Sequence, residues 1–495
     1  MRRFQYQTWI LGLLLMAPGS GSYAQAAASP TPPAAEAGSM AAVTAGTEVT
    51  RLTLEESLRE GVANNPQIRA AEARLEATRG QAMSARSNFF PKLNASATAV
   101  RLNNLSTFAL GTPTYIPTTF PVANPQGDPA PPEDHIHLVP YPSFEITSTR
   151  EGNVYGAKVE LTAPLFTGGR IYNGYQAAKL ETSAQEEEIR RLKMDTIYQV
   201  KQAFYGVLLA QAMVKVVDQS YATVAAHYKR VQDLYRQGMV SNLDLLQVEA
   251  QLASIRPQQI MAHNGLELAK LRLLAVMNMD LETNLEVAGE LAYAPGQVEE
   301  LSALKQRADQ ERPELRGLGV RVDQANRLKR VAQAGYLPTA GGFANYQWNR
   351  GQEMPPNDTI WRPGWQVGAS LTVPLFDGLN TRGQVRSAQG LKDQLLMSQA
   401  ALRTGIEAEV TAAVLTLRAS EEKMAAVGVS VQAAEKNFKV AEDRYAVGMV
   451  NHLDVMDAEV MLTTAQANYL QAVNDCLVAR ANLEKAVGQM EEVSP

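Results

Sequence analysis

The chain has 495 residues, of which 45% are apolar, 20% charged and 6% aromatic, and its formal net charge is -5. Nucleic acid is therefore excluded as an expected partner, because phosphate binding requires a basic face. The single cysteine, Cys476, leaves no intramolecular disulfide and no cysteine-based metal cluster. The apolar fraction is large enough to fill a folded core.

The chain begins with a basic residue pair followed by a short apolar run over residues 9–18 and small residues at 22–26. This pattern predicts a secretory signal peptide that is cleaved after Ala24 or Ala26. The Ala- and Pro-rich stretch that follows is expected to be a flexible leader. No later segment approaches the about 20 apolar residues of a membrane helix, so insertion into a membrane is expected through β-strands.

The rest of the chain is duplicated. Segments around Pro66 and Pro91 recur 247 residues later, whereas the motif Pro164-Leu165-Phe166 recurs 210 residues later. The first copy therefore carries 37 extra residues, and nine of the 25 prolines lie between residues 113 and 142. We expect a long surface loop with polyproline character there.

Four segments alternate between apolar and polar side chains with a period of two, as strands do: residues 93–99, 155–163, 339–348 and 365–373. Each is about ten residues long, the length of a tilted membrane strand. In the third segment, Phe343 lies on the polar side and weakens the alternation. The half-buried sheet of a soluble protein remains an alternative, but aromatic residues flank the strands as in interface girdles: Phe90, Phe166, Tyr336 and Phe376 at one end, Trp348, Trp361 and Trp365 at the other. Four strands cannot close a barrel, so a membrane sheet requires oligomerisation.

A long helical pattern follows each second strand. Residues 170–236 and 379–447 contain no proline and place apolar residues at helical spacing. Returning helices are expected from 242 to about 276 and from 452 to about 487, with Pro257 interrupting and bending the first.

The turns between these helices carry capping signals. A glycine ends each long helix, and Ser241 or Asn451 then begins the next helix as its N-cap, with an aspartate three residues later. This pattern therefore predicts one helical hairpin in each repeat. Residues 280–312 connect the repeats and are expected to form a small lateral domain.

The order of strand hairpin and long helical hairpin, used twice behind a signal peptide, resembles the TolC family of outer-membrane efflux factors over residues 52–488. The most specific motifs are Asn65-Pro66, the two Pro-Leu-Phe sequences, and the two Tyr-x-x-Gly-Met-Val tips followed by Leu-Asp. The resemblance implies an α+β membrane protein: a homotrimeric 12-stranded β-barrel with four strands per protomer, continued by a long α-helical barrel.

The resemblance also implies a function. The protein would be the passive outer-membrane channel of a tripartite efflux or type I secretion system, extending into the periplasm. It would export drugs, metals, metabolites or proteins with a periplasmic membrane-fusion adaptor and an inner-membrane transporter. No cofactor, bound metal or enzymatic activity is expected, and outer-membrane lipid would surround the barrel.

The expected division of the chain follows from these segments. It comprises a signal peptide (1–24), a flexible leader (25–50), helical barrel and equatorial parts of repeat 1 (51–90), β-hairpin 1 (91–166) with an extracellular loop (103–152), helical hairpin 1 (167–279), an equatorial connector (280–312), helical barrel of repeat 2 (313–335), β-hairpin 2 (336–376), helical hairpin 2 (377–488) and a C-terminal tail (489–495).

Family members narrow the periplasmic end with rings of charge, and the matching residues here are Asp454 and Asp457, at i and i+3 on one helix face. Trimer symmetry would place six carboxylates around the bore. Two such charges about 6 Å apart repel by about 3 kcal/mol at an effective dielectric near 20, so the ring should bind cations or hold protons. The first repeat has Asp244 but Gln247 at the paired position. The alternative is that Asp454 is only a capping residue and Asp457 a solvated acid.

The closed state of the family is also held by links between the hairpins. Tyr445 and Asp244 occupy the positions of a tyrosine-to-aspartate link. The arginine position of a second link is Val450, and its partner position is Leu243, so that link is absent here.

The tips of the hairpins resemble the turns on which periplasmic adaptors dock, and exposed apolar residues there favour a partner over loop packing as the alternative. These residues are Gly238, Met239, Val240, Val447, Gly448 and Met449.

Two other classes of protein fit the sequence less well. An enzyme is disfavoured because the chain has no nucleophile elbow, zinc-protease, P-loop or dinucleotide motif. Among the histidines, His135 and His137 lie beside acids in the Pro-rich loop, where solvation explains them better than a metal. His452, at a tip, could tune gating with pH, although its position in the first turn of a helix explains it better. His227 and His263 belong to no cluster in the sequence. A soluble periplasmic adaptor would have one helical hairpin and no lipid-facing strands.

Overall fold

A computed structural model of the chain describes residues 50–101, 115–118, 137–140, 153–350 and 360–490. All of them belong to one compact unit, Val49–Pro495. The predicted signal peptide and nearly all of the predicted leader lie outside the described residues.

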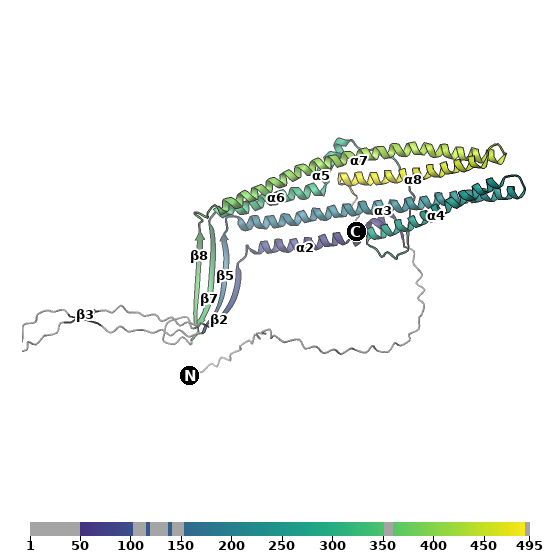
Figure 1. The fold of residues 1–495 in the computed structure, drawn as a ribbon. Helices are drawn as coiled ribbons and strands as arrows, with labels where there is room; N and C mark the ends of the chain where they lie inside the picture. The colour runs from purple at the N-terminus through teal and green to yellow at the C-terminus, as the bar shows by residue number, and fades with distance from the viewer. Residues whose placement is uncertain (1–49, 102–114, 119–136, 141–152, 351–359, 491–495) are drawn as a thin grey trace, which may run out of the picture. The chain divides into compact units, whose positions relative to one another are not determined.

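The four predicted strands form one antiparallel sheet in the order β2-β5-β7-β8 (Figure 1). The pairing of β5 with β7 joins the two repeats in a single sheet. Within the described residues, β2 and β8 are the edges of this sheet and have no further strand partner. The strands are β2 (Lys92–Arg101), β5 (Asn153–Phe166), β7 (Thr339–Arg350) and β8 (Arg362–Thr372).

The register of the sheet separates its two faces across all four strands. One row of partners is apolar throughout: Leu93, Leu161, Ala344 and Val367. The next row is polar throughout: Asn94, Glu160, Asn345 and Gln366. On the polar face Lys158 Nζ lies 2.9 Å from Glu160 Oε2, and Asn345 Nδ2 donates to Gln366 Oε1 at 3.3 Å. Because side chains alternate along each strand, this register gives the sheet one apolar and one polar face.

Phe343, which broke the alternation of the third segment, has a packing reason to lie on the polar face. Its partner across the ladder is Gly368. A Cβ built on that glycine would lie 2.7 Å from the ring of Phe343, so the ring covers the space that a side chain would fill. An aromatic ring over a strand glycine restores packing that the glycine lacks.

The Pro-rich insertion is not wholly irregular. Tyr115–Thr118 (β3) and His137–Pro140 (β4) form a two-stranded antiparallel ladder, which the expected surface loop did not include. The remainder of the expected 103–152 loop lies outside the described residues.

The two helical hairpins have matched lengths in the two repeats. The predicted long helices are α3 (Arg170–Arg236) and α7 (Asn380–Ala446), each of 67 residues, and the returning helices are α4 (Asn242–Met277) and α8 (His452–Val487), each of 36. Pro257 lies inside α4, which continues through it. The expected interruption is therefore wrong, because proline removes one amide donor while the neighbouring turns keep theirs.

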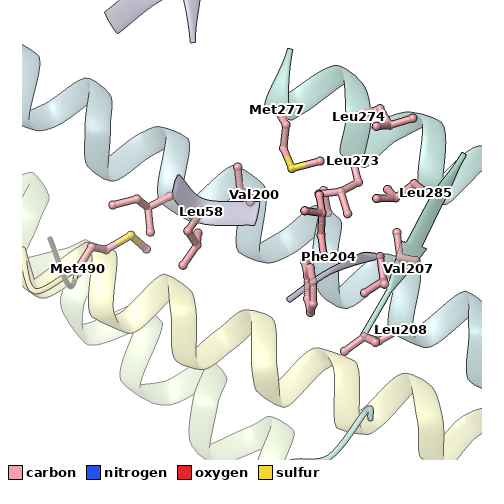
Figure 2. Close-up of a cluster of buried hydrophobic side chains, with 14 of the residues drawn as sticks. Leu58, Val200, Phe204, Val207, Leu208, Leu273, Leu274, Met277, Leu285 and Met490 are labelled. Atoms are coloured by element: carbon pink, nitrogen blue, oxygen red, sulfur yellow. The ribbon is translucent and has the colours of Figure 1, made fainter. Parts of the chain in front are cut away.

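The apolar side of α3 forms a buried cluster with α4 and β6 (Leu285–Val287) (Figure 2). Val200, Phe204 and Val207 are at most 2% exposed. They share the cluster with residues of α4 and with Leu285, whose strand pairs in parallel with β1 (Thr50–Leu52).

The expectation was that no later segment is apolar enough to cross a membrane, and one helix, α3, does not meet it. A window of α3 reaches a mean hydropathy of 1.2 and passes that test by length and composition. The same helix packs against α4, α6 and α8, and 28% of that window is buried within the protomer.

The remaining helices join the repeats at equivalent proline positions. Pro66 and Pro313 open α2 (Pro66–Ser87) and α6 (Pro313–Gln333), after the short helices α1 (Leu54–Asn64) and α5 (Leu301–Glu311). In repeat 1, Asn65 caps α2 and donates to Thr196 Oγ1 at 2.8 Å. In repeat 2 the same position is Arg312.

The buried side chain of Arg312 makes an ion pair and hydrogen bonds with two neighbouring helices. Its side chain is 6% exposed, lies 2.6 Å from Glu409 of α7, and donates to the carbonyl oxygens of Lys485 and Ala486 at the end of α8. One guanidinium therefore ties α6, α7 and α8 together at the connector.

Replacing Arg312 by methionine should lower the free energy of unfolding by about 3 kcal/mol, because breaking this ion pair removes the donor to the Glu409 carboxylate and to the carbonyl oxygen of Ala486. Urea unfolding in detergent would measure this loss. Arg316→Met on the same helix is the control, since its pair with Glu311 is 38% and 45% exposed and should contribute at most about 1 kcal/mol. Equal losses in the two variants would show that the buried contacts of Arg312 contribute no more to stability than the exposed ion pair of Arg316.

Candidate functional site at the hairpin tips

Both hairpins end in the same turn. Gly238 has φ 73° and Gly448 has φ 76°, and nothing lies within 4 Å of a Cβ built on either. The amides of Met239 and Met449 reach back to Leu234 and Arg444 at 2.9 Å. These are Schellman caps, in which glycine is needed for its left-handed backbone and not for space.

The returning helices begin with capping boxes. Ser241 accepts from the amide of Asp244 at 3.2 Å, and the Asp244 carboxylate accepts from the Ser241 amide at 2.8 Å. Asn451 and Asp454 repeat the arrangement at 2.9 and 3.1 Å. In each tip, the amides of the N-cap residue and of the aspartate three residues later therefore have partners, which stabilises the shape of the turn.

The tip turns present apolar side chains to solvent. Met239 is 68% exposed, Met449 is 76% and Val447 is 66%. Val240 is half-buried. Rigid turns that carry exposed methionine and valine offer a preformed apolar contact surface to a partner.

The predicted charge ring has its acids on the exposed side of α8. Asp454 and Asp457 are both exposed, one turn apart, while Val455, Met456 and Ala458 between and beside them are buried. In the described part of the chain, the carboxylate of Asp454 bonds only to the Asn451 amide, and no ion pair engages either acid. Both carboxylates are therefore free to interact with ions or groups on the exposed side of α8.

The predicted Tyr445–Asp244 pair lies at one junction of four helices. The carboxylate of Asp244 bonds to Ser241 and lies 3.3 Å from Nδ1 of His452. The Ser241 bonds, with His452, hold the pKa of Asp244 below its usual range. Tyr445 packs its ring on His227 at 5.0 Å between centroids, and burial raises its pKa, with Asp244 adding to the effect. The charge of Asp244 therefore acts on Tyr445, and each of the two residues lies beside a histidine.

The two histidines correct the expectation that His227 belongs to no cluster. His227 is 8% exposed and His452 is 5% exposed. Burial, then the nearby His452 and Arg230, lowers the pKa of His227 to about 4. The helical spacing of the sequence could have predicted the burial of both histidines. His227 continues the buried stripe of Val224 and Val231, and His452 lies three residues before buried Val455.

A second buried polar contact joins α3 and α8 above the tips. Ser220 donates to the carboxylate of Glu459, which also accepts from Thr463 at 3.0 Å. Glu459 is 4% exposed. Adding or removing 210 residues gives the counterparts Ser430 and Glu249, and both of these are exposed. The duplicated chain therefore uses this contact once inside the protomer and leaves its counterpart residues open.

Comparisons with known proteins accord with this geometry. The family described as "Outer membrane efflux protein" matches residues 58–279 and 304–489. The chain is 24% identical over 446 residues to "Probable efflux pump outer membrane protein TtgC" of Pseudomonas putida, which covers 88% of this chain and 82% of that protein. It is 22% identical over 346 residues to "Outer membrane protein TolC" of Vibrio cholerae, covering 69% and 78%. Its fold resembles the Campylobacter jejuni CmeC outer membrane channel, with a TM-score of 0.67 at 18% identity over 89% of this chain and 87% of that one.

Proposed function

This chain belongs to the outer membrane efflux protein family, and from that premise we propose that it is one protomer of a homotrimeric duct. The duct exports solutes or proteins from the periplasm through the outer membrane. The observation that carries the proposal is the four-stranded sheet, which has one apolar face and two edges that no other strand of the described residues pairs with.

The apolar face of the sheet supports a lipid environment. Leu93, Val367 and Leu371 are each 70–71% exposed in the protomer. In lipid such side chains are favourable, but the free edges of β2 and β8 are not, because their amides and carbonyls find no water there. Three copies that pair β2 with β8 of a neighbour close a 12-stranded barrel and remove every edge.

The helices support the same symmetry. Ser220 and Glu459 bond where α3 meets α8, and their counterparts Ser430 and Glu249 lie exposed on α7 and α4. A neighbouring protomer placed by the repeat's own pseudosymmetry brings its Glu249 to Ser430. The helical barrel then alternates one contact within protomers and the equivalent contact between them.

The tips and the charge ring give the periplasmic end its role. The tip residues 238–240 and 447–449 dock a periplasmic adaptor that links the duct to an inner-membrane transporter, consistent with the name of the efflux pump relative. Asp454 and Asp457 of three protomers line the narrow end as a gate, assisted by Asp244 and Tyr445. The duct itself is passive and performs no catalysis, so energy and cargo selection come from the transporter.

The trimer is tested with cysteine pairs in a Cys476→Ala background. Ser430→Cys with Glu249→Cys should yield covalent trimers in outer-membrane fractions with a short bismaleimide, because the pair meets between protomers. Ser220→Cys with Glu459→Cys is the matched control and should react within one chain, leaving monomers on a denaturing gel. Monomers from both pairs, or protein found only in the soluble periplasm, would refute the trimeric duct.

The gate is tested in planar bilayers. Asp454→Asn with Asp457→Asn should raise the single-channel conductance and increase the half-blocking concentration of a trivalent cation about tenfold or more, equivalent to about 1.4 kcal/mol of lost binding. Asparagine at both positions preserves size and the helix cap. Gln247→Asp is the opposite variant, since it adds an acid beside Asp244 and should strengthen the block. If neither variant changed the block, these acids would not form the gate.

Docking at the tips is tested by Met449→Glu. A charge on this exposed turn should abolish association with a periplasmic adaptor in copurification and abolish drug efflux, because it desolvates poorly in an apolar contact. Met449→Leu keeps the apolar contact and should retain both. Trimer stability and conductance should be normal in both variants, and full efflux by Met449→Glu would place docking elsewhere.

A further inference from the structure

Four residues from four helices meet near the tips of one protomer, and we call them the tip cluster: His227 of α3, Asp244 of α4, Tyr445 of α7 and His452 of α8. The His227 and Tyr445 rings are 5.0 Å apart, and Nδ1 of His452 lies 3.3 Å from Asp244 Oδ1. The two hairpins are therefore joined by the cluster at two points.

The cluster leaves two imidazole nitrogens without partners. In the described part of the chain, Nε2 of His227 and Nε2 of His452 are buried and make no hydrogen bond. Buried polar atoms in this state are uncommon, because each forfeits the hydrogen bond that water would supply. A proton added to either nitrogen would add a charge without adding a partner.

The groups around His227 make a positive charge there unfavourable. His452 faces it from α8, Arg230 adds a positive charge from its own helix, and the Tyr445 ring covers it from α7. The only carboxylate in the cluster, Asp244 of α4, is engaged by Ser241 and faces His452. The apolar residues packed nearby, including Val224, Ile255 and Val455, cannot stabilise a charge.

We propose that the tip cluster is a proton-operated latch, which joins the two hairpins of a protomer while His227 is neutral and releases them when it is protonated. The inference rests on the proposed gate at the tips and gives that gate a control by periplasmic pH. The counterpart positions in the other repeat are Asn437 and Asn242. The latch therefore occurs once per protomer and has no equivalent between protomers.

The direction of the response follows from the latched and released states. Burial lowers the pKa of His227 from 6.5 to about 4 in the latched state, and exposure on release restores it. Between these values the released state binds more protons, so acid favours release and neutral pH favours the latch. Each pH unit below 6.5 changes the ratio of released to latched protein by up to about tenfold, which gives about 30-fold at pH 5.

The test measures the separation of the tips in the purified trimer. Spin labels on Met239→Cys and Met449→Cys, in a Cys476→Ala background, report the distance between the two tips by pulsed electron resonance. Dilution with unlabelled protomers leaves the distance within one protomer. We expect a longer or broader distance to grow as the pH falls from 7.5 to 4.5, with its midpoint between 6.5 and 4.

Variants assign the response to His227. His227→Phe keeps a ring on Tyr445 and takes no proton, so its ratio should change less than twofold over the same range. His227→Gln is a second neutral variant if phenylalanine disturbs assembly. His263→Gln is the control, since His263 is exposed and pairs with Asp218 within the first hairpin, and it should respond as the parent does.

The outcomes separate the latch from the duct. A distance that does not change down to pH 4.5, or a change that persists in both His227 variants, overturns the latch. Conductance in planar bilayers is measured in parallel. Conduction without any pH-dependent separation would refute the latch and leave the duct intact, whereas separation that depends on His227 without conduction would support the latch and refute the duct.

Discussion

The free edges of one β-sheet impose the requirement on which the proposed assembly depends. β2 and β8 end a sheet whose register gives it a continuous apolar face. In water such edges would invite aggregation, and in lipid each unpaired amide or carbonyl costs several kcal/mol. In the proposed duct, a protomer of this kind would be stable only as part of a closed ring, so its assembly and its membrane insertion would be one problem.

Duplication supplies a general solution to that problem. The two helical hairpins have equal lengths, and a contact formed by Ser220 and Glu459 inside the protomer has its counterpart residues exposed on the other helices. A chain that contains the same unit twice can present to its neighbour the surface that it already packs on itself. Residues that differ between the repeats then mark where the copies have separate duties: Arg312 in place of an asparagine at the connector, and His452 in place of an asparagine at the tip.

The sequence predicted best those features that depend on local physics. Alternation of side chains identified the strands, and the glycines with their capping partners fixed the ends of the long helices, because both signals act within a few residues. Prediction failed where distant segments meet. Phe343 looked like a flaw until its cross-strand glycine was known, and His227 looked isolated because Tyr445 is 218 residues away along the chain. Pro257 was misjudged for another reason: packing along the hairpin maintains a helix that proline alone would weaken.

Packing also explains why the tips are the place for control. Large apolar clusters hold the connector region, where α3 meets α4 and β6 and where α7 meets α5 and α8. The cluster nearest the tips is smaller, with four buried residues (Val224, Ile255, Val455 and Met456) and five partly buried neighbours (Tyr221, Leu252, Phe438, Ala441 and Tyr445). Local stability follows local burial, so the ends of the hairpins can separate while the helices stay packed elsewhere. A helix of 67 residues is about 100 Å long, and a small rotation near its packed end becomes a large displacement at its tip. In the proposed latch, the protonation of one buried imidazole at this weakly packed end would then control the separation of the tips, and with it the opening of the duct.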